Sequence, residues 1–197
     1  MARLYYQGHG SFRITLDDGR VMYVDPFAGD GYDLPADLIL VTHPHRDHSQ
    51  IDLCAQKPHC RVITNTEALA GGTHQMFDVS GIFVEAVTAS NAKHDPAQCV
   101  GYLLAVDGVT VYAAGDTSRT AQMETFAARG LDYALFPCDG IYNMDLAEAA
   151  ECAALVNARC SIPIHMVPGA LFDRARAESW NAPNRLIVAP GEEIALT

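Results

Sequence analysis

The sequence has few basic residues compared with its acidic residues. It contains 13 Lys and Arg against 24 Asp and Glu, which leaves a formal net charge of −11 at pH 7. Such a chain repels a polyanionic backbone, so we expect no nucleic acid partner. No uncharged, mostly apolar run reaches 18 residues, which argues against a membrane span. The first ten residues lack the basic and then apolar pattern of a secretion signal, which favours a cytoplasmic location.

The six cysteines lack the spacing of a disulfide framework or a zinc motif. They are scattered, none forms a C-x-x-C pair, and no export signal accompanies them, so we expect six reduced thiols. Gly and Pro, at 15 and 10 residues, are close to average use, which excludes a low-complexity or fibrous chain. A chain of 197 residues that is 49% hydrophobic can bury a core, and we expect residues 1–197 to form a single domain.

Short apolar runs separated by Gly, Pro and Asp predict a series of strands. The run 38–41 is apolar on both faces, which is typical of a strand covered on both sides. Gly19 and Gly108 each follow an aspartate in a short turn that closes a hairpin. The predicted strands are Arg3–Tyr6, Ser11–Leu16, Val21–Val24, Asp37–Val41, Arg61–Thr64, Ile82–Thr88, Cys99–Val106, Thr110–Ala114, Tyr133–Phe136, Cys160–Ile164, Leu186–Val188 and Glu193–Leu196.

Helical periodicity appears between the later strands. Met123 and Phe126 share one face, and Gly130 supplies a stop. Asp145 stands three residues before Glu148, which is a capping-box pattern. We predict helices over Thr120–Arg129, Asp145–Asn157 and Pro168–Trp180. Meander strands combined with strand–helix–strand units predict an α/β fold in which helices sandwich the sheets.

A histidine cluster directly follows the buried strand that ends at Val41. The segment Thr42-His43-Pro44-His45-Arg46-Asp47-His48 holds four potential metal ligands, at positions 43, 45, 47 and 48. A strand would send the last of these to the opposite side, and a helix would separate the first two by about 200°. A strand end that turns into a helix start gathers them best, with one pair facing one ion and one pair facing a neighbouring ion. Imidazole with carboxylate suits zinc, and manganese or iron are the alternatives.

The segment from Thr42 to His48 resembles the T-H-x-H-x-D-H signature of the metallo-β-lactamase fold superfamily. Gly115-Asp116-Thr117 resembles that family's bridging aspartate motif, and His94 and His165 stand after or at the ends of predicted strands, like its third and final histidines. Two further segments are similar to a branch of small stand-alone hydrolases that includes the ascorbate-6-phosphate lactonase type: Gly8-His9-Gly10-Ser11-Phe12 and Val24-Asp25-Pro26-Phe27. The resemblance covers about residues 4–196 and implies a four-layer αββα sandwich.

The resemblance also implies a dinuclear metal site. Asp116 and His165 each end a predicted strand, and sites in layered α/β folds collect at such ends. Two divalent ions against two carboxylates leave the site at about +2, which lowers the pKa of a bridging water and attracts a small anionic substrate. The implied ligands are His43, His45 and His94 for the first ion, Asp47, His48 and His165 for the second, and Asp116 as the bridge.

Residues around these ligands can be predicted less directly. Metal-bound histidines usually donate their second N–H to a carboxylate or carbonyl. Asp25, at a strand end, is the candidate for such a partner, with an ordinary turn aspartate as the alternative. The resemblance suggests that His9 lies near the metals, in contact with substrate or with a ligand. Asp47 and His48 are the candidate catalytic residues, and Asp47 could relay a proton as well as bind metal.

Together these features predict a dinuclear metal-dependent hydrolase that uses a metal-bridging hydroxide to cleave a small ester, lactone or phosphoester. The lactone rests on the resemblance alone. Three alternatives remain at this stage. A nuclease or phosphodiesterase of the superfamily would need an inserted domain or a basic arm. A non-catalytic metal-binding sensor or partner-binding module has no chemical need for all seven ligands. A flavin-partnered diiron oxidoreductase should carry Glu where this chain has His45.

Overall fold

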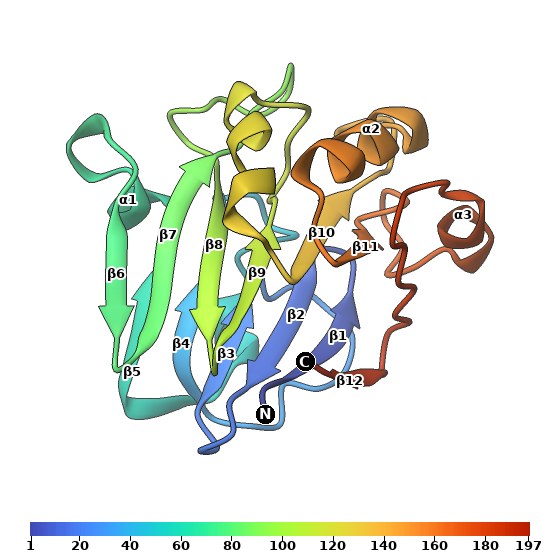
Figure 1. The fold of residues 1–197 in the computed structure, drawn as a ribbon. Helices are drawn as coiled ribbons and strands as arrows, with labels where there is room; N and C mark the ends of the chain where they lie inside the picture. Colours follow the sequence, from blue (N-terminus) through green and yellow to red (C-terminus); the bar gives the residue numbers. More distant parts are fainter.

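Two six-stranded mixed sheets pack face to face in the computed structural model, which describes all of residues 1–197 (Figure 1). The first sheet has the order β12-β1-β2-β3-β4-β5, and the second has the order β11-β10-β9-β8-β7-β6. The strands of the first sheet are β1 (Arg3–Gly8), β2 (Ser11–Thr15), β3 (Val21–Val24), β4 (Ala36–Leu40), β5 (Gln56–Ile63) and β12 (Glu193–Ala195). Those of the second are β6 (Met76–Val79), β7 (Ile82–Thr88), β8 (Val100–Val106), β9 (Val109–Ala113), β10 (Tyr133–Pro137) and β11 (Cys160–Ile164).

Each sheet changes from antiparallel to parallel pairing along its width. In the first sheet, β1, β2 and β3 pair antiparallel, whereas β3, β4 and β5 pair parallel. In the second, β6 to β9 pair antiparallel, and β9, β10 and β11 pair parallel. The parallel strands therefore end at a common edge of the sandwich, the edge to which the arrowheads of β7 and β10 point in Figure 1.

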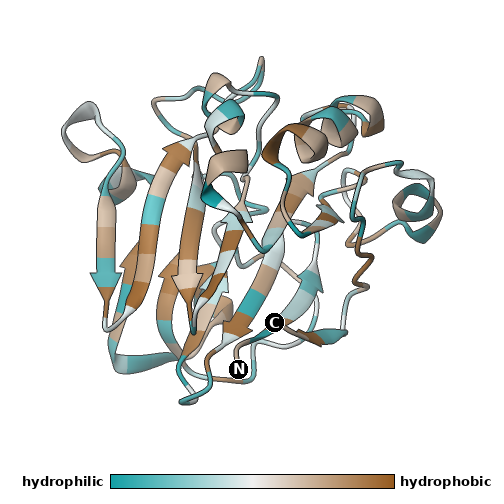
Figure 2. Ribbon diagram, viewed as in Figure 1, coloured by the Kyte–Doolittle hydropathy of each residue, from teal (hydrophilic) through white to brown (hydrophobic).

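Apolar residues fill two main layers. A cluster of 28 buried residues lies between the two sheets, and 19 more pack the outer side of the second sheet against the helices. The brown strand segments in Figure 2 follow these layers. Outside the first sheet the cover is thinner, because Tyr32, Leu34 and Ile51 from a loop and a short 3₁₀ turn pack there. This arrangement confirms the predicted α/β sandwich of the metallo-β-lactamase type.

The helices are α1 (Asn65–Ala68), α2 (Leu146–Val156) and α3 (Arg174–Ser179), with 3₁₀ segments η1 (Ile51–Leu53), η2 (Ala70–Gly72), η3 (Ala121–Thr125) and η4 (Ala127–Arg129). The predicted helix 145–157 is confirmed: the Asp145 side chain accepts a hydrogen bond from the Glu148 N–H and caps α2. The longest helix has 11 residues, and no helix combines the length and apolar character needed to cross a bilayer.

Several predicted elements were wrong. The helix over Thr120–Arg129 is two 3₁₀ segments, and the Thr120 side chain makes no capping hydrogen bond to nucleate an α-helix. The helix over Pro168–Trp180 shrinks to Arg174–Ser179, since Gly169 has a φ of +74° and the Asp173 side chain caps only the later turn. The segment Leu186–Val188 forms no strand.

The start of β5 and the whole of β6 were missed because the residues there are polar or exposed. β5 begins at Gln56 rather than Arg61, and all of its side chains except Ile63 are exposed or half-buried along the edge of the first sheet. β6 was not predicted at all, since it is a four-residue edge strand with Met76 and Asp78 exposed.

Candidate metal centre

All of the predicted ligands meet at the common edge of the two sheets. The cluster 43–48 follows β4, His94 lies between β7 and β8, Asp116 follows β9, and His165 follows β11. Crossover connections in parallel sheets bring loops from successive strands to the same edge, which explains how residues up to 122 positions apart become neighbours. His45 is exposed and Asp47 is partly exposed, whereas the other five predicted ligands are buried.

One group of donors consists of His43, His45 and His94, whose ligand atoms lie within 4.8 Å of one another. Nε2 of His43 and Nδ1 of His45 are 3.1 Å apart. The ring nitrogens of His43, His45 and His94 therefore converge on one small region. Three imidazole nitrogens in this arrangement suit one divalent ion.

A second group consists of Asp47, His48, His165 and His9, also within 4.8 Å. Nε2 of His165 lies 3.9 Å from Oδ2 of Asp47. Nε2 of His9 lies 3.1 Å from the same carboxylate oxygen. Of the two roles expected for His9, contact with substrate or with a ligand, the structure shows contact with the predicted ligand Asp47.

Asp116 lies between the two groups. Its Oδ2 is 3.3 Å from Nε2 of His94 and 3.5 Å from Nε2 of His165, and its Oδ1 is 3.5 Å from Nε2 of His48. One carboxylate therefore faces imidazoles of both groups, which is the position that a residue bridging two ions must occupy.

The outward nitrogen of each buried histidine has a partner. Nδ1 of His48 lies 2.9 Å from Oδ2 of Asp25, as predicted for Asp25. The corresponding partners are the Thr42 hydroxyl for His43 and the Asn91 side-chain oxygen for His94, each at 3.0 Å. Nδ1 of His165 lies 3.0 Å from Oδ2 of Asp139, a close ion-pair contact without hydrogen-bond geometry. These contacts leave the inward nitrogens free to bind an ion.

The residues fit a metal by a further observation. Nε2 of His48 and Nε2 of His165 are buried, and neither has a hydrogen-bond partner. Buried polar atoms without partners are rare, because each costs about 1–3 kcal/mol of lost hydration. A cation held by the second group would satisfy both nitrogens at once.

Asp139 was missed by the sequence reasoning. It is buried at the end of β10, and its Oδ1 accepts hydrogen bonds from the backbone N–H groups of Ile141, Tyr142 and Asn143. The available signal was its position: Asp139 follows β10 as Asp116 follows the neighbouring β9.

Burial and charge set the protonation of the cluster. Burial opposes a charge on His48, but the carboxylates of Asp116 and Asp25 outweigh it and raise the pKa of His48 to about 9. Burial also opposes a charge on Asp116, and the surrounding imidazoles overcome this and lower its pKa to about 2. The pKa of His43 is lowered to about 2, mainly by burial. The centre thus keeps Asp116 ionised and His43 neutral, as metal ligation requires.

Three residues at the centre have left-handed backbone conformations. The φ values are +56° for His9, +48° for Asp25 and +44° for His165. Residues other than glycine seldom adopt this region, although Asn, Asp and His do so more often than the rest, and it persists where the surroundings hold it. Here the His165 N–H donates to the His9 carbonyl at 2.8 Å, which joins the two turns.

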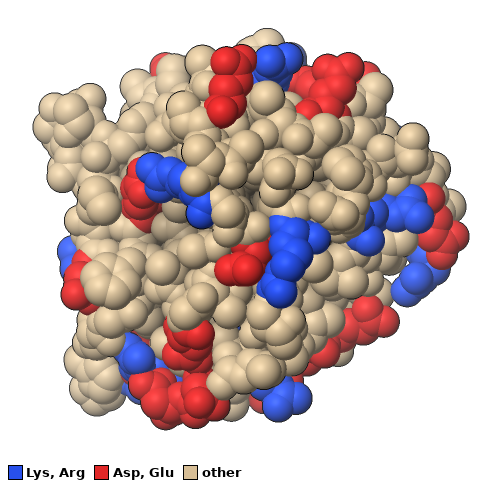
Figure 3. Space-filling model, in the orientation of Figure 1, with Lys and Arg blue, Asp and Glu red and all other residues tan.

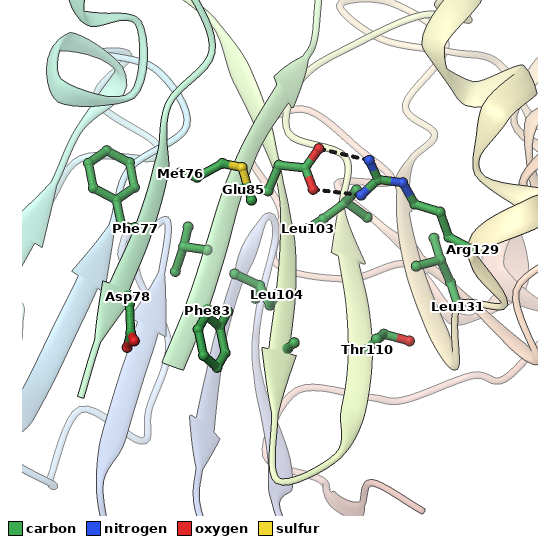
Figure 4. A pocket seen from close by; sticks show the side chains of 12 residues that line it. Met76, Phe77, Asp78, Phe83, Glu85, Leu103, Leu104, Thr110, Arg129 and Leu131 are labelled. Atoms are coloured by element: carbon green, nitrogen blue, oxygen red, sulfur yellow. Dashed lines mark hydrogen bonds and ion pairs between the residues drawn. The ribbon is translucent and has the colours of Figure 1, made fainter. Parts of the chain in front are cut away.

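A cavity of about 570 Å³ opens over the centre and is lined by His45, Arg46, Asp47, Lys93, His94, Asp116, Tyr142, His165, Pro168 and Gly169. A separate apolar cavity of about 440 Å³ lies on the outer face of the second sheet (Figure 4). Met76, Phe83 and Leu103 line it, and the ion pair between Glu85 and Arg129 spans it. It offers no imidazole or thiol, so the chemistry belongs to the polar cavity.

Comparison with known proteins identifies the family of the chain. A family model described as "Beta-lactamase superfamily domain" matches residues 3–165. A protein named UPF0173 metal-dependent hydrolase from Nitratidesulfovibrio vulgaris is 33% identical over 191 residues, which covers 83% of this chain and 79% of that protein. A protein of the same name from Myxococcus xanthus is 35% identical over 189 residues, which covers 80% of this chain and 68% of that protein.

Solved structures share the fold. A metallo hydrolase from Ignicoccus hospitalis superposes with a TM-score of 0.73 at 22% identity, over 98% of this chain and 97% of that one. At this identity the likeness concerns the fold alone. The family match and the relatives' identities go further: the chain belongs to the metallo-β-lactamase superfamily, and its relatives carry the name metal-dependent hydrolase.

Proposed function

We propose that this protein is a hydrolase that binds two divalent ions and cleaves a small ester, lactone or phosphoester. The observation that carries the proposal is the placement of Asp116 between two groups of converging imidazole nitrogens. His43, His45 and His94 would hold one ion, and Asp47, His48 and His165 the other. Zinc suits this donor set, and manganese or iron are alternatives. When bound, two such ions supply Lewis acidity and lower the pKa of water.

The chain's own residues keep the donors in place. Asp25 and Asp139 face the Nδ1 atoms of His48 and His165, so each imidazole presents Nε2 to the interior. Nε2 of His9 contacts Asp47, and this hydrogen bond lowers the pKa of the Asp47 carboxyl below its usual range. Asp47 is also partly open to the cavity, so its ionised carboxylate can accept a proton from a reacting group.

The substrate class follows from the cavity and the resemblance. A volume of about 570 Å³ suits a small molecule. Lactones are candidate substrates because the Gly8–Phe12 segment is similar to that of the lactonase branch. Esters and phosphoesters enter through the chemistry that paired divalent ions support.

The test combines metal analysis of the purified, reconstituted protein with a panel of lactones, thioesters, phosphodiesters and β-lactams. We expect two ions per chain and turnover of at least one class, lost in His48→Ala. Fewer than one ion per chain would contradict the dinuclear centre. Normal metal content and turnover in His48→Ala would contradict the assignment of ligands. Two bound ions without any turnover would favour a metal-binding sensor.

A further inference from the structure

Two basic side chains stand apart from all the others. Of the 13 Lys and Arg residues, eight form ion pairs, Arg176 and Arg185 donate to backbone carbonyls, and Arg61 lies over the Phe77 ring. The ion-paired residues are Arg3, Arg13, Arg20, Lys57, Arg119, Arg129, Arg159 and Arg174. Figure 3 shows several basic side chains beside acidic ones on one face. The side chains of Arg46 and Lys93 have no such partner.

Both unpartnered cations line the cavity over the metal centre. Arg46 lies between two predicted ligands in the loop after β4, and Lys93 directly precedes His94 in the loop between β7 and β8. They come from different sheets, so the two charges reach one cavity only through the tertiary fold. Asp95, the acidic residue of the loop that carries Lys93, accepts a hydrogen bond from the Ala97 N–H and forms no ion pair with Lys93.

The charge balance at the centre gives Arg46 and Lys93 a particular weight in the net charge of the cavity. Four carboxylates surround the donors: Asp47 and Asp116 among them, and Asp25 and Asp139 against His48 and His165. Formally they neutralise two divalent ions, where the sequence, counting two carboxylates, predicted about +2. The net positive charge of the cavity wall therefore comes from Arg46 and Lys93.

We infer that Arg46 and Lys93 together bind an anionic oxygen group, a carboxylate or a phosphate, on the substrate, away from the bond that is cleaved. A guanidinium and an ammonium at one site hold such a group by charge-assisted hydrogen bonds. The inference rests on the proposed hydrolase function for the identity of the bound molecule as substrate. It narrows the substrate class to small hydrolysable molecules that carry a negative charge.

The first test uses two esters with the same leaving group, neutral 4-nitrophenyl acetate and anionic mono-4-nitrophenyl succinate. We expect the zinc-loaded protein to prefer the succinate ester in kcat/KM. This preference should fall about tenfold in Arg46→Gln/Lys93→Gln, through KM rather than kcat, because two solvent-exposed charge contacts, each worth about threefold, together correspond to that factor. The control Arg159→Gln removes a half-exposed cation at the end of β11 opposite to His165 and should keep the preference. An unchanged preference in the double variant would overturn the inference.

A second readout does not depend on turnover. Titration calorimetry of the zinc-loaded protein with succinate and, separately, with methyl phosphate measures binding of each anion group. The anion that the wild-type protein binds more tightly, succinate or methyl phosphate, identifies the preferred group as a carboxylate or a phosphate. At equal zinc content, we expect the double variant to bind this anion about tenfold more weakly than the wild type. Equal binding by both proteins would refute the anion site. If succinate binding depends on the pair but no ester is cleaved, the hydrolase proposal fails and the anion site stands.

Discussion

The carboxylate of Asp139 makes two kinds of contact. One oxygen accepts from three successive backbone N–H groups, and the other faces Nδ1 of His165 at 3.0 Å and accepts from the Asn143 amide. The same side chain therefore shapes the loop that carries Tyr142 at the cavity and orients a predicted metal ligand. These hydrogen bonds outweigh its burial and hold the pKa of Asp139 below its usual range.

Removing this carboxylate should weaken the second ion site. In Asp139→Ala, we expect zinc affinity at one of the two sites to fall by about 10–100-fold, as is usual when the partner of a ligating histidine is lost. Asp139→Asn should not restore the affinity. Its amide NH₂ would face donors in either orientation: the backbone N–H groups of residues 141–143, or His165 and the Asn143 amide. Competition with a chromogenic chelator measures the affinity.

The control is Asp132→Asn, whose carboxylate accepts from Thr110 away from the centre. Full zinc affinity in Asp139→Ala would mean that His165 needs no such partner.

His48 provides a pH dependence. Its raised pKa, about 9 against an ordinary 6.5, means that the metal-free protein holds a proton on His48 at pH 7. Zinc must displace this proton, so affinity should rise with pH and level off above about pH 9. In the metal-free protein the same shift stabilises the fold fully below about pH 6.5, and this contribution is lost as pH rises through 9.

Calorimetry in two buffers of different ionisation enthalpy measures the protons released on zinc binding. We expect about one from His48 at pH 7 and none from it at pH 10. His48→Ala should lack this release. A wild-type protein that releases no proton at pH 7 would show that Asp25 and Asp116 do not keep His48 protonated.

Among the elements, strands with continuous apolar runs were predicted well and short or polar ones were not. β4 and β8 are buried along their whole length or nearly so, and their sequences carry that pattern. Edge strands such as β6 form through pairing with a neighbour, which leaves little pattern in four residues. The predicted helix over 120–129 had the right apolar face but no cap, and it settled as 3₁₀ turns.

The turn between β1 and β2 supports the metal centre by packing on it. A Cβ placed on Gly10 would lie 2.9 Å from Cε1 and 3.2 Å from Nδ1 of His48. Gly10→Ala should therefore displace the His48 ring from Asp25. We expect zinc affinity to fall by about 10–100-fold, with a loss of roughly 1–3 kcal/mol in the free energy of unfolding.

Gly19→Ala is the matched control. Gly19 has a φ of +84° and no atom within 4 Å of an added Cβ, so the substitution should cost about 1–2 kcal/mol of stability through backbone strain alone. Zinc affinity should be unchanged there. If Gly10→Ala also keeps full affinity, the His48 ring does not depend on this turn.

At the scale of the whole molecule, the candidate metal ligands come from both sheets. The cluster 43–48 follows β4 of the first sheet, whereas His94, Asp116 and His165 follow strands of the second. Ions bound to donors from both sheets would connect the two halves of the sandwich at one edge.

Chelation should therefore lower the stability of the whole chain. A ligand present at 1,000 times its Kd stabilises the folded state by about 4 kcal/mol, which for a chain of this size corresponds to a Tm change of roughly 10 °C. Thermal unfolding with and without a chelator measures the shift. It should be smaller in His48→Ala, and a Tm that does not respond to chelation would contradict a metal shared by the two sheets.

The amino-acid sequence by itself determined the family, the sandwich architecture and the seven candidate ligands, because the cluster 42–48 is compact and the later ligands stand beside apolar strands. Only the tertiary structure decided what surrounds those ligands. Asp139 lies against His165 through the parallel pairing of β10 with β11, and Arg46 and Lys93, from loops of different sheets, line one cavity. Such contacts join residues far apart in the chain, and no local pattern of apolar and polar residues records which distant loops will share an edge.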